Sequence, residues 1–403
     1  MIPNFASPEY RHDPYPVYKM LRTRYPLWQS PHGYWVLSKY EDITTVLKNK
    51  SLGCDTSILP ARPESDWKQR VELFQHVSKT VFGQDGDTHT RLQKPLLSIF
   101  NKKRLDQERS KIQSLAHSII DANVNAGGMD LIKDFAQPLV LKTIFGIIGI
   151  NQGIINSIAY NTDEVLGKNS IIKVLTPSPY ITRDDVIQAI RTHGKLIEYA
   201  KQSIEQNRHT PSDNLISSLI QAVDQNEITE EEMVCSVFAI QNTSLDSEVS
   251  LLGNAVIALD RFPDQKAMLL NDLTLIPEAV KEALRYDTAT QYSIRFVYDK
   301  LTIRGTVLPH GSVIVGLVGS ANRDPEAFPD PDRFDILREN KNHLSFTMGA
   351  HKCLGAVLAT LISEEALRAL YSRLPALRIK PEATLEYTEP WTIRGVRSLP
   401  IIW

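Results

Sequence analysis

Cysteine is scarce in this sequence. Cys54, Cys235 and Cys353 are the only three in 403 residues, and no C-x-x-C pair occurs. An odd and sparse set argues against a disulfide framework and indicates a reducing compartment. An excess of charge of one sign is also missing, because 45 Lys and Arg residues face 47 Asp and Glu residues, which leaves a net charge of -2. No global basic field is therefore available for binding nucleic acid.

Long apolar runs are lacking as well. The best candidate, Pro138–Ile150, is interrupted by Lys142 and is shorter than the ~20 apolar residues that span a bilayer, so it is better interpreted as a buried helix. The N-terminus has neither the basic start nor the apolar core of a secretory signal. Since 42% of the residues are apolar and 23% are charged, as in ordinary globular proteins, we expect a soluble cytoplasmic protein that does not bind a membrane.

Short elements occupy the two ends of the sequence. β-type patterns cover Gly33–Ser38, Lys300–Arg304 and Ser312–Leu317, and helical patterns cover Glu41–Asn49 and Leu354–Leu374. Residues 51–87 show no sustained period, and connections of this length are usually lids or binding loops.

Helical patterns dominate residues 87–275. The longest begins with a capping box, Thr229 with Glu232, and continues to Arg261, where Phe262-Pro263 ends it. At about 1.5 Å per residue this helix is ~48 Å long, so we expect it to cross the whole protein and to be buried. Helices in the middle and short strands at both ends predict a mainly α protein with small β-sheets.

The strongest chemical signal is the segment Phe346-Thr347-Met348-Gly349-Ala350-His351-Lys352-Cys353-Leu354-Gly355. It places Cys353 at the start of a helix, where backbone N–H groups stabilise an anionic sulfur, and its glycines let the backbone approach a flat group closely. Such a site suits a thiolate that binds a metal. Two other interpretations stay open: a buried structural cysteine, and a Cys/His nucleophile using His351, which lies too near along an extended loop for good geometry. Cys54 and Cys235 have no such context and are interpreted as ordinary small residues.

The same segment resembles the haem-binding signature F-x-x-G-x-H/R-x-C-x-G of the cytochrome P450 haem-thiolate monooxygenases in their soluble bacterial form. Phe346, Gly349, His351, Cys353 and Gly355 fill its fixed positions. The resemblance implies one domain with the cytochrome P450 fold over residues 1–403, and a long central helix over the haem. It further implies haem b (iron protoporphyrin IX) as the cofactor and Cys353 as the axial metal ligand, whose electron donation favours O–O cleavage.

Glu282-Ala283-Leu284-Arg285 resembles the E-x-x-R motif of the same family. Residues i and i+3 share a helix face, so the two charged side chains can form one polar unit. In the family an arginine from a later segment completes this unit, and Arg333 in Pro331-Asp332-Arg333-Phe334 matches that position. The resemblance implies a structural role for the network, on the haem side of the core.

The resemblance also implies that His89, Arg295 and His351 bind the haem carboxylates, for which charge-assisted hydrogen bonds give a physical basis. The sequence departs from the family at Gln93, where relatives usually have an arginine, and Lys94 beside it is a candidate replacement.

The family motif A/G-G-x-D/E-T aligns with Thr243-Ser244-Leu245-Asp246-Ser247 in the central helix. Asp246 keeps the acid and Ser247 replaces the threonine, so the resemblance implies that these are the catalytic residues that relay protons. Ser244 replaces the glycine that leaves room for dioxygen. On one hypothesis, Ser247 does the work of threonine and Ser244 adds only a local backbone hydrogen bond. On the other, proton delivery is altered because the substrate supplies a hydroxyl or amine, or because the reaction is not simple hydroxylation.

The sequence has no G-x-G-x-x-G after a strand and no cysteine cluster, so we expect neither a flavin nor an iron–sulfur centre in the chain. The resemblance implies that ferredoxin and ferredoxin reductase supply the electrons. In the family the region that corresponds to residues 91–111 borders the proximal side of the haem. Here this region has two acidic residues, Asp106 and Glu108, and seven basic ones: Arg91, Lys94, Lys102, Lys103, Arg104, Arg109 and Lys111. A charge run is usually a solvated face, but this one also suits docking of an acidic ferredoxin.

By resemblance, the substrate contacts lie in residues 51–87, 167–181, 239–243 and 289–294 and in the turn near Thr392 and Ile393. These segments are largely apolar or neutral, as expected for a mostly apolar pocket. The resemblance thus implies a monomeric monooxygenase that uses O2 to oxidise a small or medium-sized, mostly apolar substrate of natural-product biosynthesis, free or carrier-bound. The alternatives are a haem-thiolate enzyme that catalyses coupling, cyclisation or a peroxide-driven reaction, and a haem-binding sensor without oxygenase activity.

Overall fold

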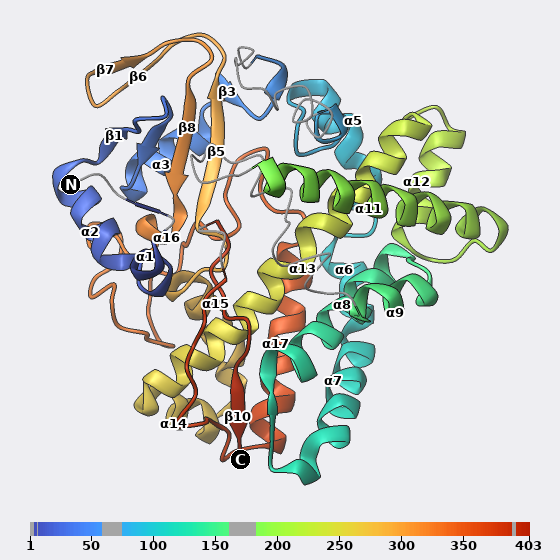
Figure 1. Cartoon of the computed structure of the whole chain (residues 1–403), viewed down its shortest axis with the longest axis vertical. Helices are drawn as coiled ribbons and strands as arrows, with labels where there is room; N and C mark the ends of the chain where they lie inside the picture. Colours follow the sequence, from blue (N-terminus) through green and yellow to red (C-terminus); the bar gives the residue numbers. More distant parts are fainter. Residues whose placement is uncertain (1–3, 6, 59–74, 161–182, 389–391) are drawn as a thin grey trace.

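The computed structural model describes residues 4–5, 7–58, 75–160, 183–388 and 392–403. Figure 1 shows most of the helices packed together on one side of the molecule and a β-sheet with a few short helices on the other. The C-terminus lies at the lower end of the helical part, and the N-terminus lies beside the sheet. The prediction of a mainly α protein with small sheets is confirmed.

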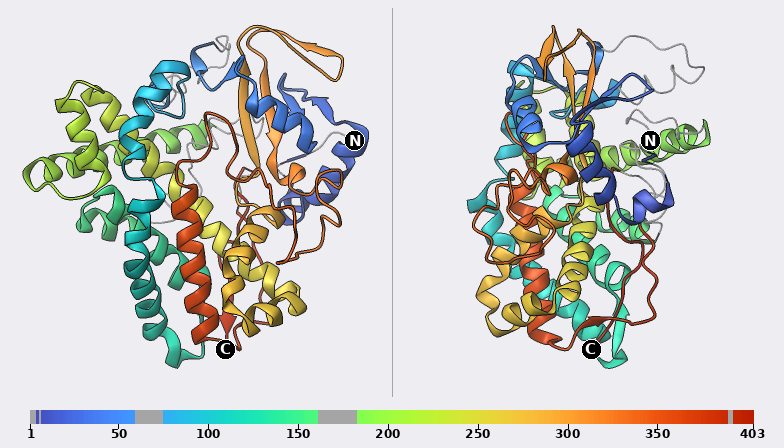
Figure 2. Two further views of the ribbon diagram at one scale, coloured as in Figure 1. Left: turned by 180° about the vertical axis from the view of Figure 1, so that it is seen from behind. Right: turned by 90° about the vertical axis from the view of Figure 1, so that its left-hand side faces the viewer.

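The helical part consists of a long run of helices and one helix near the C-terminus. They are α5 Gly86–Leu97, α6 Lys102–Leu105, α7 Arg109–Asn123, α8 Gln137–Ile148, α9 Gln152–Tyr160, α11 Arg183–His209, α12 Leu215–Asp224, α13 Glu230–Arg261, α14 Pro263–Asn271, α15 Ile276–Tyr286 and α17 Ala356–Arg373. Short turns of tighter or wider helix lie between them: η2 Asp106–Glu108, η3 Val124–Ala126, η4 Leu131–Ala136 and η6 Leu273–Leu275. Figure 2 shows α7 and α17 side by side, and they are in contact along their lengths.

Helix α13 has the bounds that the sequence predicts, Glu230–Arg261. Its capping box is formed, because the Glu232 amide donates to Thr229 Oγ1 and the Thr229 amide donates to the Glu232 carboxylate. It ends where Pro263 begins α14. Since α13 contacts α8, α11, α12, α15 and α17, it is the central helix of this part, and its position fixes which side chains the other helices meet.

The largest sheet brings the two ends of the chain together. Its strand order is β1-β2-β8-β5-β3, with β2 and β8 parallel and the other pairs antiparallel. The strands are β1 Leu27–Gln29, β2 Trp35–Leu37, β3 Leu52–Gly53, β5 Tyr292–Val297 and β8 Val313–Leu317. All five residues of β8 are buried, which explains why that strand is a continuous apolar run.

Short helices flank this sheet, and two smaller sheets complete the fold. The helices are α1 Pro8–His12, α2 Tyr15–Arg24, α3 Tyr40–Lys48, α16 Val318–Ala321 and the single turn η1 Thr56–Ile58. The second sheet has the order β4-β10-β9 and the third is the hairpin β6-β7, with β4 Gly128–Asp130, β6 Leu301–Ile303, β7 Thr306–Leu308, β9 Arg378–Ile379 and β10 Pro400–Ile402. The strands and helices predicted near both ends are therefore confirmed as β2, β6, β8, α3 and α17, within two residues at every boundary.

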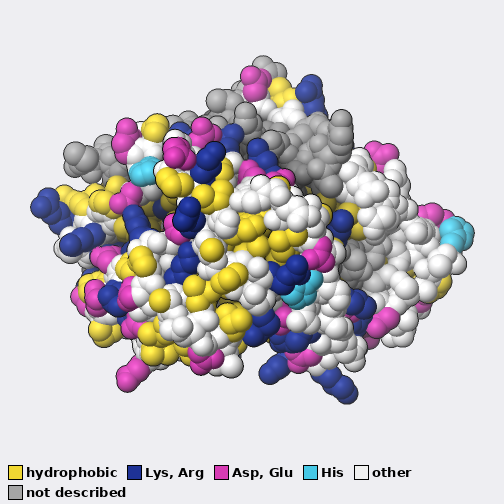
Figure 3. Space-filling model, turned by 90° about the horizontal axis from the view of Figure 1, so that it is seen from below, with side chains coloured by type: hydrophobic (Ala, Val, Ile, Leu, Met, Phe, Trp, Pro, Cys, Tyr) yellow, Lys and Arg dark blue, Asp and Glu magenta, His cyan; other side chains and the backbone are white. Residues whose placement is uncertain are grey.

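The apolar segment at residues 138–150 forms α8, which is buried along most of its length. In the described ranges, no helix combines the length and the apolar character that crossing a membrane requires. Figure 3 shows basic and acidic side chains scattered over the lower face with hydrophobic ones between them, in keeping with the nearly balanced charge of the sequence.

The polar network at Glu282 corrects one sequence prediction. Arg285 Nη2 donates to Glu282 Oε1 over 2.7 Å and Arg285 Nε donates to Oε2 over 2.9 Å, and both side chains are fully buried. The third member is Arg338, whose Nε donates to Glu282 Oε1 over 3.1 Å. The predicted Arg333 is wrong: its half-exposed side chain pairs with Asp264. Only the carbonyl of Arg333 reaches the network, where it accepts from Arg285 and Arg338.

Candidate active site

The loop before α17 holds Cys353 by backbone contacts. The Cys353 amide donates to the Phe346 carbonyl over 2.9 Å, which closes the loop. Within it, Gly349 has a φ of +77°, and a Cβ there would lie 2.5 Å from the Leu47 carbonyl oxygen. Glycine is therefore required at this position both for its conformation and for the close approach of α3.

The sulfur of Cys353 faces a cavity, so its accessible surface is that of the cavity wall. Burial raises the pKa of the Cys353 thiol, and backbone N–H groups of Gly355 and Ala356, which point at the sulfur, oppose that rise. Amides at a helix N-terminus stabilise a thiolate. At Gly355 a Cβ would lie 3.8 Å from this sulfur, which is an ordinary van der Waals contact.

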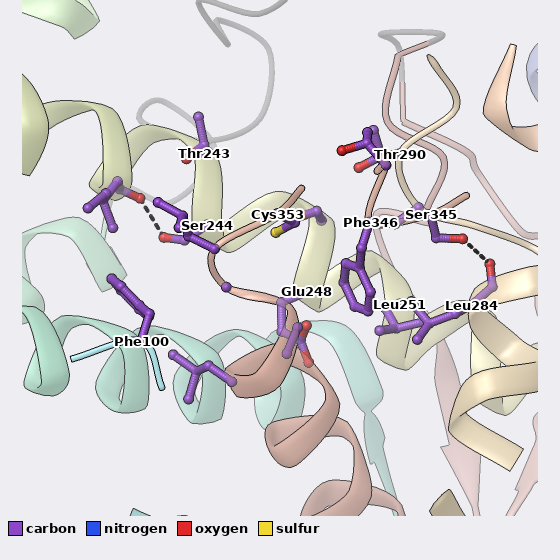
Figure 4. A pocket seen from close by; sticks show the side chains of 18 of the residues that line it. Phe100, Thr243, Ser244, Glu248, Leu251, Leu284, Thr290, Ser345, Phe346 and Cys353 are labelled. Carbon is purple, nitrogen blue, oxygen red and sulfur yellow. Dashed lines mark hydrogen bonds between the residues drawn. The ribbon is translucent and has the colours of Figure 1, made fainter. Parts of the chain in front are cut away.

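The cavity has a volume of about 350 Å³ and lies between α13, α15, α17 and the Cys353 loop. Figure 4 shows Cys353, Phe346 and Glu248 around it, with Thr243 and Ser244 further along α13. Its walls are mostly apolar: Phe82, Phe100, Ile144, Ile240, Thr243, Ser244, Ser247, Glu248, Leu251, Leu284, Thr288, Ala289, Thr290, Ser345, Phe346, Thr347, His351, Cys353, Leu354, Gly355, Leu358 and Ala359. Five of the seven predicted cofactor-binding residues lie in the Cys353 loop. Four of these five line the cavity, and the fifth, Gly349, does not.

The predicted proton-relay residues lie differently on α13. Ser247 lines the cavity, whereas Asp246 does not and is half-buried. Burial raises the pKa of Asp246 to about 7. Ser244 Oγ donates to the Ile240 carbonyl over 2.7 Å, which is the local backbone hydrogen bond that the simpler hypothesis expects of it.

The three predicted carboxylate-binding side chains lie near one another beside the Cys353 loop. The rings of His89, on α5, and His351 have centroids 4.5 Å apart, and buried Arg295, on β5, is close enough to affect the pKa of His351. Lys94 does not join them, because its ammonium pairs with Glu227. Gln93 lies on a separate surface hollow.

Asp85 is a member of this cluster that the sequence did not indicate. Its Oδ1 accepts from His351 Nε2 over 2.7 Å, and its Oδ2 accepts from the Cys54 amide and from the Tyr298 hydroxyl. Burial lowers the pKa of His351, but hydrogen bonds with Asp85 and the Cys54 side chain outweigh it and raise the pKa to about 9. The Cys54 side chain therefore lies close enough to His351 to affect its pKa. Nothing in the sequence pairs Asp85 with a residue 266 positions away.

Glu248 is a second site residue that the sequence did not indicate. It is 3% exposed, it lines the cavity, and its Oε1 accepts from Ser363 Oγ over 2.8 Å. Helical spacing could have indicated it, because positions 244, 248 and 251 lie on the same face of α13 as Ser247, which is predicted to be catalytic.

The predicted substrate segments contribute unevenly to the cavity. Ile240 and Thr243 line it from α13, and Ala289 and Thr290 line it after α15. Thr392 and Ile393 are buried but do not line it. Residues 167–181, and residues 59–74 within the connection at 51–87, lie outside the described residues.

Comparison with known proteins matches the whole chain. The family model for cytochrome P450 matches residues 253–374. Cytochrome P450 133B1 of Xylella fastidiosa is 30% identical over 399 residues, 99% of this chain and 98% of that protein. The 6-deoxyerythronolide B hydroxylase of Saccharopolyspora erythraea is 28% identical over 412 residues, with 99% and 98% covered. Among solved structures, P450BioI in complex with an acyl carrier protein ligated to hexadec-9Z-enoic acid superposes with a TM-score of 0.88, 27% identity and coverage of 99% and 100%.

The fold and these matches define a haem-thiolate oxidoreductase. The chain belongs to the cytochrome P450 family: it is a cytochrome P450 monooxygenase, and its cofactor is haem b. The residues present fit that cofactor, because a mostly apolar cavity faces a thiol, and because Arg295 and His351 lie beside the loop, where cationic groups can bind carboxylates.

Proposed function

We propose that Cys353 holds the haem iron through its sulfur. The observation that carries the proposal is a sulfur that faces the cavity and receives two backbone N–H groups at the start of α17. His89, Arg295 and His351 hold the haem carboxylates, and Phe346, Gly349 and Gly355 shape the loop and the wall beside the cofactor. When bound, the haem supplies the activation of dioxygen, which the thiolate ligand favours. The protein positions substrate and excludes water.

Asp246 and Ser247 hold and pass the protons that oxygen activation consumes. Ser247 lines the cavity, and Asp246 is the half-buried residue before it on α13. With a pKa of about 7, the Asp246 carboxyl exchanges protons readily near neutral pH, which suits an acid that must be reprotonated in each cycle.

Replacing Ser247 with alanine tests this role. Without the hydroxyl, protons reach the oxygen site more slowly, so we expect more NADPH to be consumed unproductively. The measurement is hydrogen peroxide released per NADPH oxidised in a ferredoxin-driven assay, which should rise severalfold. Ser250→Ala, on the same helix but outside the cavity wall, is the control. An unchanged ratio in Ser247→Ala contradicts a direct role for this hydroxyl.

The substrate proposed is a small or medium-sized, mostly apolar molecule of natural-product biosynthesis. The apolar cavity walls support it, as does the similarity to a hydroxylase of 6-deoxyerythronolide B. The similarity to P450BioI, solved with an acyl carrier protein, supports a carrier-bound substrate. We also propose that residues 1–403 form one domain and act as a monomer in the cytoplasm.

Ferredoxin is the proposed electron donor. Most basic residues of the 91–111 segment have acidic partners within the chain: Arg91 pairs with Glu232, Lys94 with Glu227, Arg104 and Lys111 with Glu108, and Arg109 with Glu365. Lys102 and Lys103 are exposed and have no acidic partner in the described part of the chain. They are therefore the charges of this segment that an acidic protein can engage.

The double substitution Lys102→Glu and Lys103→Glu is expected to slow ferredoxin-driven reduction by roughly tenfold at low salt, because steering by opposite charge raises association rates by about that factor or more. The difference should shrink as salt is added. Stopped-flow reduction of the carbon-monoxide-bound protein measures it, with Lys300→Glu on the remote β6-β7 side as the control. Equal rates at every salt concentration contradict docking at this surface. A peroxide-driven enzyme, the alternative function, would lose no turnover in the double variant.

A further inference from the structure

Glu248 is a buried carboxyl without a cationic partner. It is 3% exposed, and within the described residues its one hydrogen bond is that from Ser363 Oγ to Oε1, 2.8 Å long. Burying an unpaired carboxylate is costly, so such a group is normally neutralised by a proton. Oε2 is the oxygen that Ser363 leaves available for it.

The helices that pack around the cavity present mainly apolar side chains on the sides facing Glu248. The helices α8, α15 and α17 present Ile144, Leu284, Leu358 and Ala359 to the cavity. The titratable side chains on the described cavity wall, besides Glu248 itself, are His351 and Cys353, and Asp246 is the other acid on this part of α13. Burial raises the pKa of Glu248 to about 8.

Charge on Glu248 is felt at the cofactor site. A negative Glu248 raises the pKa of Cys353, so the field of this carboxyl reaches the sulfur that faces the cavity. Figure 4 shows the two side chains in the same part of the cavity. In an interior of low dielectric, the interaction between two buried groups such as Glu248 and Cys353 is weakly screened.

We propose that Glu248 is a positioning residue that balances charge: when it is ionised, it takes up one proton as one electron enters the haem. The proposal rests on the assignment of the haem to the cavity beside Cys353. At a pH where Glu248 is ionised, a one-electron donor adds one negative charge to the cavity and one proton from water joins Glu248 Oε2, so the net charge of the cavity does not change. Ser363 fixes the carboxyl by its hydrogen bond to the other oxygen.

The test is the midpoint potential of the haem-loaded protein, measured by dithionite titration from pH 6 to pH 10. In the wild type, the potential should be constant at low pH and should fall as the pH rises through about 8, because an ionised Glu248 opposes reduction. Glu248→Gln, a neutral isostere, should match the wild type at pH 6 and stay higher at high pH. Ser250→Ala, on the same helix but outside the cavity wall, is the control and should keep the fall near pH 8.

Ser363→Ala provides a second variant that keeps the carboxyl. The Ser363 hydrogen bond lowers the pKa of Glu248, so its loss should move the fall to higher pH. The inference is overturned if Glu248→Gln keeps the pH-dependent step, or if it shifts the potential equally at every pH, as a merely structural change would. The red-shifted carbon-monoxide band of the reduced protein separates the two proposals: its absence in the wild type refutes the thiolate assignment, whereas its presence with unchanged potentials refutes only the role of Glu248.

Discussion

Replacing Cys353 with alanine is expected to remove the red-shifted Soret band of the reduced carbon-monoxide complex and with it the turnover of the enzyme. The reason is that this band and the activation of dioxygen both depend on a thiolate ligand, and Cys353 is the cysteine whose sulfur faces the cavity. The measurement is the reduced carbon-monoxide difference spectrum, normalised to bound haem.

The other two cysteines provide matched controls. Cys235 is fully buried on α13, and burial raises the pKa of its thiol to about 11, so it stays protonated. Cys54→Ala and Cys235→Ala should therefore keep the thiolate band, although Cys54→Ala removes a side chain that raises the pKa of His351. A red-shifted band that persists in Cys353→Ala would assign the iron to another ligand.

Replacing Glu282 with alanine is expected to lower the free energy of unfolding by about 3–5 kcal/mol, because it leaves buried arginine charge unpaired. Glu282 accepts hydrogen bonds from Arg285, Arg338 and the Asp335 amide, and its side chain is fully buried. A loss of this size is a large part of the stability of an ordinary domain. Urea unfolding followed by the haem band and by far-ultraviolet circular dichroism measures the effect.

Glu278→Ala, one turn earlier on α15, is the control. Glu278 pairs with Lys281 and Lys341 at a side chain that is 37% exposed, and such surface pairs contribute about 0–1 kcal/mol. If Glu282→Ala unfolded at the same urea concentration as Glu278→Ala, the network would not have the structural role inferred for it. Arg333→Ala should also have a small effect, since its side chain lies outside the network.

Local signals predicted much of the fold. The capping box at Thr229 and the proline at 263 define both ends of α13, because a helix end depends on hydrogen bonds among neighbouring residues. The loop of Cys353 was equally predictable from the sequence, since its glycine and cysteine lie within a few residues of one another in the motif.

Pairings across the chain were not predictable in the same way. Arg333 and Arg338 are both arginines that follow the E-x-x-R helix, and the choice between them depends on how the intervening chain turns, with the Arg333 carbonyl inward and its side chain outward. The contact of Asp85 with His351 depends on α5, β5 and the Cys353 loop packing together.

The sequence by itself determined the family, the mainly α architecture, the central helix and the cysteine that faces the cavity, because each depends on residue types at short, fixed spacing. The tertiary structure decided which side chains meet: Arg338 at Glu282, Asp85 at His351, and Glu248 with Ser363 beside Cys353. These contacts join elements far apart in the chain, and their geometry is set by the packing of whole helices and strands. Local propensity does not specify that packing.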